Sequence, residues 1–443
     1  MATRASQPVR SPNSSPRPST SKPSSKTPKR SSSKLSSVST NTQQTPVSDP
    51  FRSRSSTSAA ASSSSSSSYR LDSSVATTSV SSHASLSSLR DSLPENTKIY
   101  DFSEIRAATN NFLGKRLSAS SSSSQSWRCV LNGKDVVVFQ RKLRKSMSSS
   151  DVQQKLAVIS RSHFTSIVKL LGVSISGEHI YLVYEFVDGS DLESCLRNKL
   201  NPNFTVLSNW MSRMQIATDI AHGLDYIHNN AGLSIDMVHK HVKSSGIIVT
   251  EPSYNAKICH FGAAELCGET STSAAADELR RAAPESDRQF EGVRGYMSPE
   301  FKISGVASQK SDVYAFGVVI LELMTGEEPV RYKFDRSSGN YNLISVIDTA
   351  REAVEGGGGG ESAVDGRLRR WVDKRLRDSF PVEAAEKLVR VALQSVQEDP
   401  DKRPEMKWVA GKISKLYLAS KIWSDRVKVP TGISVSLGPR LNW

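Results

Sequence analysis

Hydrophobic residues first alternate with a period of two along the chain and later recur with a helical period. The run DVVVF at 135–139 follows an Asn-Gly turn and predicts one strand of a hairpin. Apolar residues spaced by three and four over 152–160 predict a helix, after which IVKLLGV and IYLVYEFV predict two further strands. This first part of the pattern is typical of a small, strand-rich lobe.

Helical spacing dominates the remainder. Residues 211–230 carry apolar side chains on one helical face, and residues 311–326 are apolar nearly all round, as expected for a helix at the centre of a lobe. The glycines at 356–360 predict a surface loop, and 386–396 resumes a helical pattern. The sequence therefore predicts an α+β fold in which a small strand-rich lobe precedes a larger helical lobe.

Composition changes this picture only at the ends. The first hundred residues are rich in Ser and dotted with Pro, and such a segment buries too little apolar surface to form a core. We expect a disordered basic tail over 1–96, one folded domain over 97–420, and a C-terminal extension over 421–443.

The net charge is +14, and roughly half of the excess lies in the tail. A basic tail favours acidic surfaces such as phospholipid headgroups, although a plain solvated arm is an equal alternative. No base-reading motif supports nucleic acid as a partner.

The cysteine pattern and the start of the chain bear on localisation. The 4 cysteines show no paired metal spacing and favour a reduced compartment. The longest apolar run is too short to span a bilayer, and Ala2 excludes N-myristoylation. We expect a cytoplasmic protein, with a peripheral plasma-membrane association through the tail. The Ser-rich, acid-poor start also resembles an organellar transit peptide, and import is the alternative.

Five motifs together carry a family resemblance: LVYEF, HxxVKSSxII, GYMSPE, SDVYAFG and DPDKRP. The segment 102–416 resembles the protein kinase superfamily, in particular the plant receptor-like kinases. FSEIRAATNNF and the stretch from RLRRWVDKRL to VRVAL are similar to kinase domains of LysM receptor-like kinases, without their ectodomain. The resemblance implies the two-lobed protein kinase fold.

The resemblance also implies structural roles for residues that this sequence keeps. Glu300 and Arg403 are expected to form a buried ion pair, and Asp312 is expected to cap the catalytic-loop backbone. The remaining matches are two residues of the spine that joins the lobes and the glycine of the metal-binding triplet: His239, Phe261 and Gly262.

The nucleotide site departs from the family pattern. The phosphate-covering loop has no glycine and reads LSASSSSSQS, including Ser118, Ser121 and Ser124. At the strand positions that normally hold an Ala against adenine and a Lys on the phosphates, this sequence has Val137 and Phe139. The partner Glu of that Lys, on the next helix, is replaced by Lys155. The remaining matches to the nucleotide site come from LVYEF: Tyr184, Glu185 and Phe186.

The chemistry-bearing positions depart as well. The catalytic Asp is replaced by His241, the metal-binding Asn by Gly246 and the metal-binding Asp by His260. Of the catalytic loop only Lys243 remains. Imidazole is a poor ligand for Mg²⁺, a hard cation that prefers carboxylate oxygen. These losses together predict a pseudokinase, a kinase fold that acts as a scaffold or allosteric partner, with no cofactor required.

Two enzymatic alternatives stay open. A nucleotide site rebuilt around Arg141 or Lys115 would give a non-standard Ser/Thr kinase, with weak or metal-independent ATP binding. The pair His241 and His260 would instead suit Zn²⁺ or a similar ion. The expected partners are active receptor-like kinases, which would phosphorylate the segment 270–273 and so alter binding.

Overall fold

The computed structural model describes residues 97–114, 116–117, 125–144, 147–200, 207–229, 237–269, 292–337, 339–357 and 361–427. The chain divides into two units, Met1–Val80 and Ser81–Trp443, and every described residue belongs to the second. The expected tail, the three serines of the phosphate-covering loop, Lys115 and the segment 270–273 lie outside the described residues.

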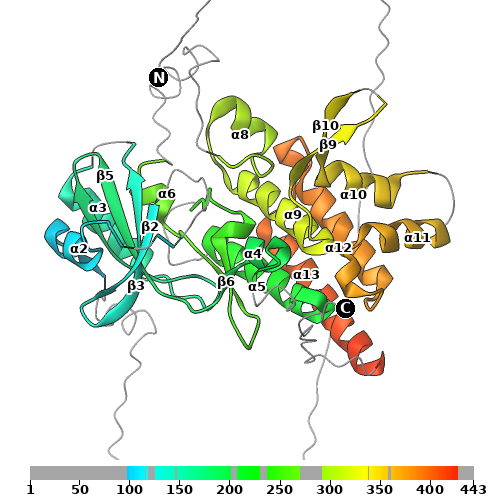
Figure 1. The fold of residues 1–443 in the computed structure, drawn as a ribbon, viewed down its shortest axis with the longest axis horizontal. Helices are drawn as coiled ribbons and strands as arrows, with labels where there is room; N and C mark the ends of the chain where they lie inside the picture. The colour runs from blue at the N-terminus through cyan, green and yellow to red at the C-terminus, as the bar shows by residue number, and fades with distance from the viewer. Residues whose placement is uncertain are drawn as a thin grey trace, which may run out of the picture. The chain divides into compact units, whose positions relative to one another are not determined.

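The smaller lobe is built on a five-stranded sheet with the order β1-β4-β5-β3-β2, in which β1 and β4 are parallel and the other neighbours antiparallel (Figure 1). Its elements are β1 (Lys98–Ile99), α2 (Phe102–Ala108), β2 (Gln125–Leu131), β3 (Lys134–Lys142), α3 (Ser149–Ser160), β4 (Leu170–Ser176) and β5 (His179–Glu185).

Strand β3 shows how the sequence builds this sheet. Asn132 and Gly133 have φ of 51° and 73°, the left-handed pair that a tight two-residue hairpin turn requires. Val136 and Val138 are buried against the core of the lobe, and the alternate residue Phe139 points to the cleft between the lobes. The alternation predicted for 135–139 is therefore the alternation observed.

The larger lobe is mainly helical and has two small sheets, β6-β7-β8 and β9-β10. Its strands are β6 (Ser190–Asp191), β7 (Ile247–Val249), β8 (Ala256–Ile258), β9 (Val330–Asp335) and β10 (Asn340–Ser345). Its helices are α4 (Leu192–Arg197), α5 (Trp210–Asn229), α6 (Ala263–Leu266), α8 (Pro299–Ser304), α9 (Gln309–Thr325), α10 (Val346–Glu355), α11 (Glu361–Trp371), α12 (Val382–Ser395) and α13 (Met406–Val427), with 3-10 turns η2 (Ser244–Gly246), η4 (Lys374–Leu376) and η5 (Pro400–Lys402).

Helix α9 is the centre of this lobe. Its residues from Asp312 to Thr325 are all buried, which agrees with the all-round apolar pattern. Helix α12 packs closely against it, because a Cβ at Gly317 would lie 2.8 Å from the Val396 side chain. Any larger residue at that position would force the two helices apart.

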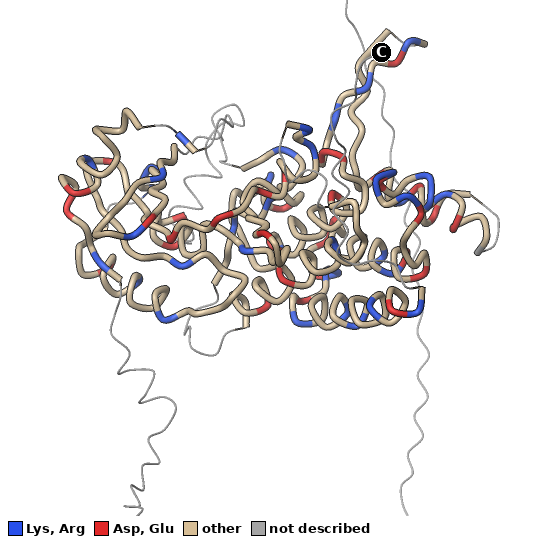
Figure 2. Tube along the Cα trace, turned by 60° about the horizontal axis from the view of Figure 1, so that its bottom comes forward, with Lys and Arg blue, Asp and Glu red and all other residues tan. Residues whose placement is uncertain are grey.

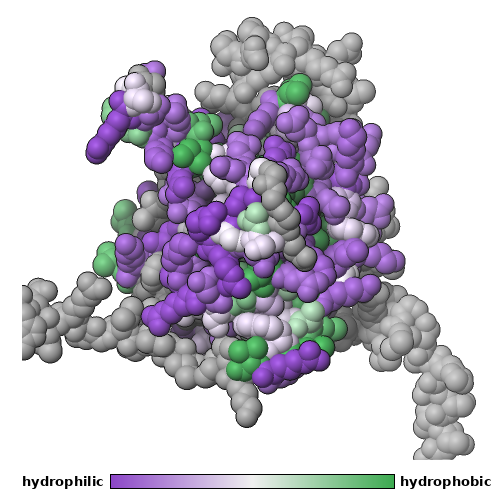
Figure 3. All heavy atoms as spheres, turned by 90° about the vertical axis from the view of Figure 1, so that its right-hand side faces the viewer, coloured by the Kyte–Doolittle hydropathy of each residue, from purple (hydrophilic) through white to green (hydrophobic). Residues whose placement is uncertain are grey.

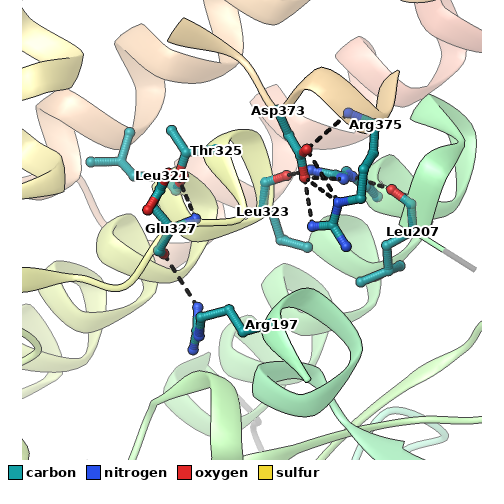
Figure 4. Close-up of polar contacts among 9 residues, drawn as sticks. Arg197, Leu207, Leu321, Leu323, Thr325, Glu327, Asp373 and Arg375 are labelled. Carbon is teal, nitrogen blue, oxygen red and sulfur yellow. Dashed lines mark hydrogen bonds and ion pairs between the residues drawn. The ribbon is translucent and has the colours of Figure 1, made fainter. Parts of the chain in front are cut away.

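Hydrogen bonds from buried charged side chains join α9 to the segments that surround it. The Arg213 guanidinium is 2% exposed and donates to the Leu323 carbonyl at 2.7 Å and to the Asp373 carboxylate at 2.6 Å. Figure 4 shows Asp373 in contact with Arg375 as well, while Arg197 of α4 donates to the backbone of Glu327. Two separate groups of polar contacts thus join α4 and α5 to the C-terminal end of α9.

The predicted α+β arrangement is confirmed, with differences at the edges of elements. The strand predicted at 167–173 is shifted to 170–176, because residues 166–168 pair with β8 of the larger lobe. The hairpin β9-β10 was not predicted. Helix α13 runs through residue 420, so the expected domain boundary falls inside a helix.

The surface of the described part is mixed in charge. Figure 2 shows basic and acidic residues interspersed along the helices, and Figure 3 shows that the face nearest α11 is mostly hydrophilic. Among the described residues, no helix is both long and apolar enough to cross a bilayer.

Glu300 and Arg403 form the expected ion pair. The guanidinium donates to both carboxylate oxygens at 2.7 Å, and its side chain is fully buried. We expect Glu300→Ala to lower the free energy of unfolding by about 3–5 kcal/mol, because the buried Arg403 would lose its counter-charge. Urea unfolding followed by circular dichroism measures the change.

The control is Glu383→Ala on α12, where the pair with Lys387 is exposed on both sides and the loss should be much smaller. Burial raises the pKa of Glu300, but hydrogen bonds from Arg403 and Ser298 outweigh it and lower the pKa. The stabilisation is therefore present above the unfolded pKa and lost as the pH falls through the lowered folded value. Equal losses for both variants at pH 7 would contradict the expectation.

Candidate functional site

The loop that carries the candidate catalytic positions is held by one carboxylate. Asp312, 1% exposed, accepts hydrogen bonds from the backbone amides of His239 and Lys240, both at 2.7 Å. His228 Nε2 lies 3.0 Å from the same carboxylate. Lys240 has a φ of 67°, a strained conformation for a residue with a side chain, and these bonds hold it there.

His239 joins this loop to the strand that precedes His260. Its Nδ1 accepts from the His241 amide at 3.3 Å, so its Nε2 carries the proton and donates to the Cys259 carbonyl at 2.8 Å. Burial lowers the pKa of His239 and keeps the ring neutral. The residue that the resemblance assigned to the spine therefore makes a fixed link between the two segments of the site.

His241 stands at the catalytic-base position and contacts two charged groups. Its Nε2 lies 3.2 Å from the Glu269 carboxylate and 3.5 Å from Nη1 of Arg141. Burial, and next the charge of Arg141, lower the pKa of His241 to about 4, so the ring is neutral at pH 7. One nitrogen cannot donate to Glu269 and accept from Arg141 together, and the shorter contact favours Glu269.

Glu269 is a site residue that sequence reasoning missed. It also pairs with Lys240 at 2.7 Å and is 8% exposed. Burial raises the pKa of Glu269, but the contacts with His241 and Lys240 outweigh it and lower the pKa well below the usual range. Lys240 is thus paired with a carboxylate of its own chain. No sequence signal identified this residue, because nothing fixes its position except the fold after Gly262.

His260 stands at the metal-ligand position and is packed against an aromatic ring. The ring centroids of His260 and Phe139 are 4.5 Å apart in an edge-on arrangement, and Tyr184 completes the cluster at 6.2 Å from His260. Burial lowers the pKa of His260 well below its usual value, with Arg141 adding to the effect. Its Nδ1 has no hydrogen-bond partner among the described residues.

The helix α3 is tied to the segment after His260 rather than to β3. Lys155 donates to the Glu265 carboxylate at 2.5 Å and to the Glu265 carbonyl at 3.2 Å, which joins α3 to α6. The strand position Phe139 contacts His260 instead. Phe139 and Lys155, which occupy the positions of the family's strand–helix ion pair, therefore both contact the segment from His260 to Glu265. Sequence reasoning did not identify Glu265 as a site residue.

Glycine is sterically required at only one of the two glycine positions of the site. Gly262 has a φ of 79°, and a Cβ there would lie 2.7 Å from the Ile159 side chain, so only glycine fits. At Gly246 a Cβ would make ordinary contacts, 3.6 Å from Cγ of Lys243 and 3.8 Å from Cδ2 of His260. Sterics do not require glycine at 246.

Two cavities adjoin these residues. The first, of about 820 Å³, is lined by predicted nucleotide-site residues: Val137, Phe139, Tyr184, Glu185, Phe186 and His260. The second, of about 910 Å³, is lined by the loop residues His241 and Lys243 together with Arg141 and residues 292–298. The structure therefore divides the predicted residues that line a cavity between two cavities, while Lys155 and Gly246 line neither.

The connection between the lobes is fixed by Glu185 and Phe186. Glu185 Oε1 accepts from the Lys169 amide at 3.1 Å, and the Arg128 guanidinium lies over the Phe186 ring at 3.6 Å from its centroid. Tyr184 donates its hydroxyl to the Phe261 carbonyl at 2.9 Å. These contacts hold the LVYEF segment against both the sheet and the HFG triplet.

A metal centre finds no ligand set in the residues that the structure describes, since no group of three or more His, Cys, Asp or Glu side chains is placed to hold an ion. His241 is turned to Glu269, and His260 is packed against Phe139. The buried Cys259 keeps a pKa raised to about 12 by burial, which disfavours the thiolate that metals bind.

Comparison with known proteins agrees with this geometry. The model of the protein tyrosine and serine/threonine kinase family matches residues 126–413. Over 312 residues the chain is 31% identical to the proline-rich receptor-like protein kinase PERK2 of Arabidopsis thaliana, covering 70% of this chain and 40% of that protein. Over 336 residues it is 30% identical to LysM domain receptor-like kinase 3 of the same plant, covering 74% and 48%.

A third relative, Protein LYK5 of Arabidopsis thaliana, is 27% identical over 329 residues, covering 74% of this chain and 45% of its own length. The chain thus spans less than half the length of these three relatives. The resemblance to plant receptor-like kinases is confirmed by them. With the two-lobed fold and the matched segment, the chain belongs to the protein tyrosine and serine/threonine kinase family.

Proposed function

We propose that this protein is a pseudokinase that acts as a scaffold or allosteric partner in receptor-like kinase signalling. The observation that carries the proposal is the contact between Phe139 and His260 at 4.5 Å. These side chains stand where family members place a phosphate-binding Lys and a metal-binding Asp. An aromatic contact in their place supplies neither positive charge for the phosphates nor carboxylate oxygen for Mg²⁺.

The base position supports the same proposal. A neutral imidazole with a pKa lowered to about 4 takes a proton poorly at pH 7, and His241 already contacts Glu269. Phosphoryl transfer depends almost wholly on positioning and on neutralising charge. With the catalytic base, the metal ligands and the strand Lys all changed, the chain lacks most of the groups that phosphoryl transfer requires.

One observation favours a second candidate, a non-standard ATP-binding Ser/Thr kinase. The cavity of about 820 Å³ beside Glu185 and Phe186 is large enough for a nucleotide. Val137 and Phe139 narrow it on the strand side, so binding there would be weak and independent of metal. The pseudokinase proposal needs no bound nucleotide.

For partners we propose active receptor-like kinases. The proposal is supported by the family likeness alone: the chain keeps the two-lobed kinase fold, and the relatives that it resembles are named receptor-like kinases. The basic tail supports a further contact with acidic phospholipid at the plasma membrane from the cytoplasmic side. Organellar import remains the alternative location, and nucleic acid is not proposed as a partner.

We expect the melting temperature of the full chain to show no Mg²⁺-dependent or Mn²⁺-dependent rise with ATP, because a ligand stabilises the native state only if it binds there. Differential scanning fluorimetry with ATP, with and without each metal, measures this. An active receptor-like kinase domain treated identically is the positive control. A metal-dependent rise would mean that a complete nucleotide site exists and would exclude the pseudokinase proposal.

Phosphotransfer itself is the second test. We expect the incorporation of labelled phosphate into myelin basic protein to be the same for the parent chain and for His241→Ala, because neither offers a carboxylate base. Scintillation counting of the substrate band measures the rate. A parent rate about tenfold above that of the variant would assign His241 a catalytic role and favour the second candidate.

A further inference from the structure

Two cations converge on the larger cavity without a carboxylate of their own. Arg141 projects from β3 and Lys243 from the catalytic loop, and both line the cavity of about 910 Å³. The Nε atom of Arg141 is buried and has no hydrogen-bond partner in the described part of the chain. Because Nε2 of His241 is engaged by Glu269, the guanidinium also lacks a good acceptor on that side.

Two carboxylates line the same cavity, Glu193 and Glu328, and neither forms an ion pair with Arg141 or Lys243 in the described part of the chain. Glu193 lies 3.9 Å from Arg197, and the neighbouring Glu269 pairs with Lys240 at 2.7 Å. None of the ion pairs among the described residues includes Arg141 or Lys243. Burial, and next the charge of Arg141, lower the pKa of Lys243, while Glu193 opposes them, so the two cations are close enough to interact.

Two partly buried cations that line one cavity repel each other, and an anion bound between them would relieve that repulsion. A phosphate monoester suits this pair, because the planar guanidinium fork binds two phosphate oxygens and an ammonium adds a compact charge. No metal is needed, since the side chains themselves supply the positive charge. His241, neutral at pH 7, adds none.

The position of the cations decides which phosphate fits. The aromatic pair Phe139 and His260 lines the cavity beside Glu185 and Phe186, and Arg141 does not line that cavity. Arg141 and Lys243 open to the other side, where the wall is formed by residues 292–298 and 328–332. Strand β9 contributes residues 330–332 to this lining, and Met297 and Phe301 add apolar side chains, a combination that suits a polypeptide.

We propose that this cavity binds a phosphorylated side chain of a partner protein, held by Arg141 and Lys243 in the absence of metal. The inference rests on the proposed binding role and adds its ligand. This domain would then bind a protein that a partner kinase has phosphorylated, with the phosphate in this cavity.

The test uses the full chain with EDTA present. The probe is a fluorescent peptide pool with one central phosphothreonine and random flanking residues, and the reference is the same pool with threonine. We expect saturable fluorescence anisotropy only with the phosphorylated pool, and a loss of affinity of about tenfold or more in Arg141→Gln and in Lys243→Met. Lys142→Met is the matched control, because Lys142 is exposed and pairs with Glu178 away from the cavity; its affinity should equal that of the parent.

Two kinds of result would contradict this proposal. Equal binding of both pools, or variants that keep the parental affinity at an unchanged melting temperature, would overturn the proposal. Competition by ATP or by inorganic phosphate at concentrations equal to or below those of the phosphopeptide would show a nucleotide or a general phosphate site, and would overturn the peptide assignment. A failure here leaves the metal-dependence and phosphotransfer results unchanged, so the pseudokinase proposal is judged on those alone.

Discussion

The buried carboxylate of Asp312 fixes the backbone on which the rest of the cleft depends. It sits on the central helix α9 and accepts the amides of His239 and Lys240 at 2.7 Å each, which holds Lys240 in a left-handed conformation. With that loop fixed, His239 reaches the Cys259 carbonyl and so sets the position of His260. The fold of the site is therefore independent of the chemistry that its side chains carry.

On this fixed frame the charges have been redistributed. The resemblance places carboxylates on the catalytic loop, on α3 and before Phe261, and in this chain those positions are His241, Lys155 and His260. Two of these positions contact carboxylates of the following segment. Glu265 pairs with Lys155, and Glu269 contacts His241 and pairs with Lys240. Each new charge has a neighbour of opposite sign, which satisfies the demand that buried charges be paired.

Arg141 and Lys243 are the exception, and this is why they suggest a ligand. Pairing within the chain has neutralised Lys155 and Lys240, and burial has neutralised the imidazoles of His241 and His260. The remaining positive charge, on Arg141 and Lys243, lines one cavity. Its separation from the aromatic pair Phe139 and His260 divides a single cleft into a charged side and an apolar side.

The sequence by itself determined the two-lobed arrangement, the strand alternation around Val136 to Phe139 and the central helix, because periodicity follows directly from which faces are buried. Short motifs with fixed spacing also predict that His241, Gly246 and His260 stand at changed positions of the family pattern, and this stays a prediction. Only the tertiary structure decided what those residues contact. Glu265 lies far in sequence from its partner Lys155, and Glu269 lies well away from its partner Lys240. No local sequence pattern predicts pairing across such separations. The division of the cleft into two cavities likewise depends on packing between segments from both lobes, which the order of residues along the chain does not encode locally.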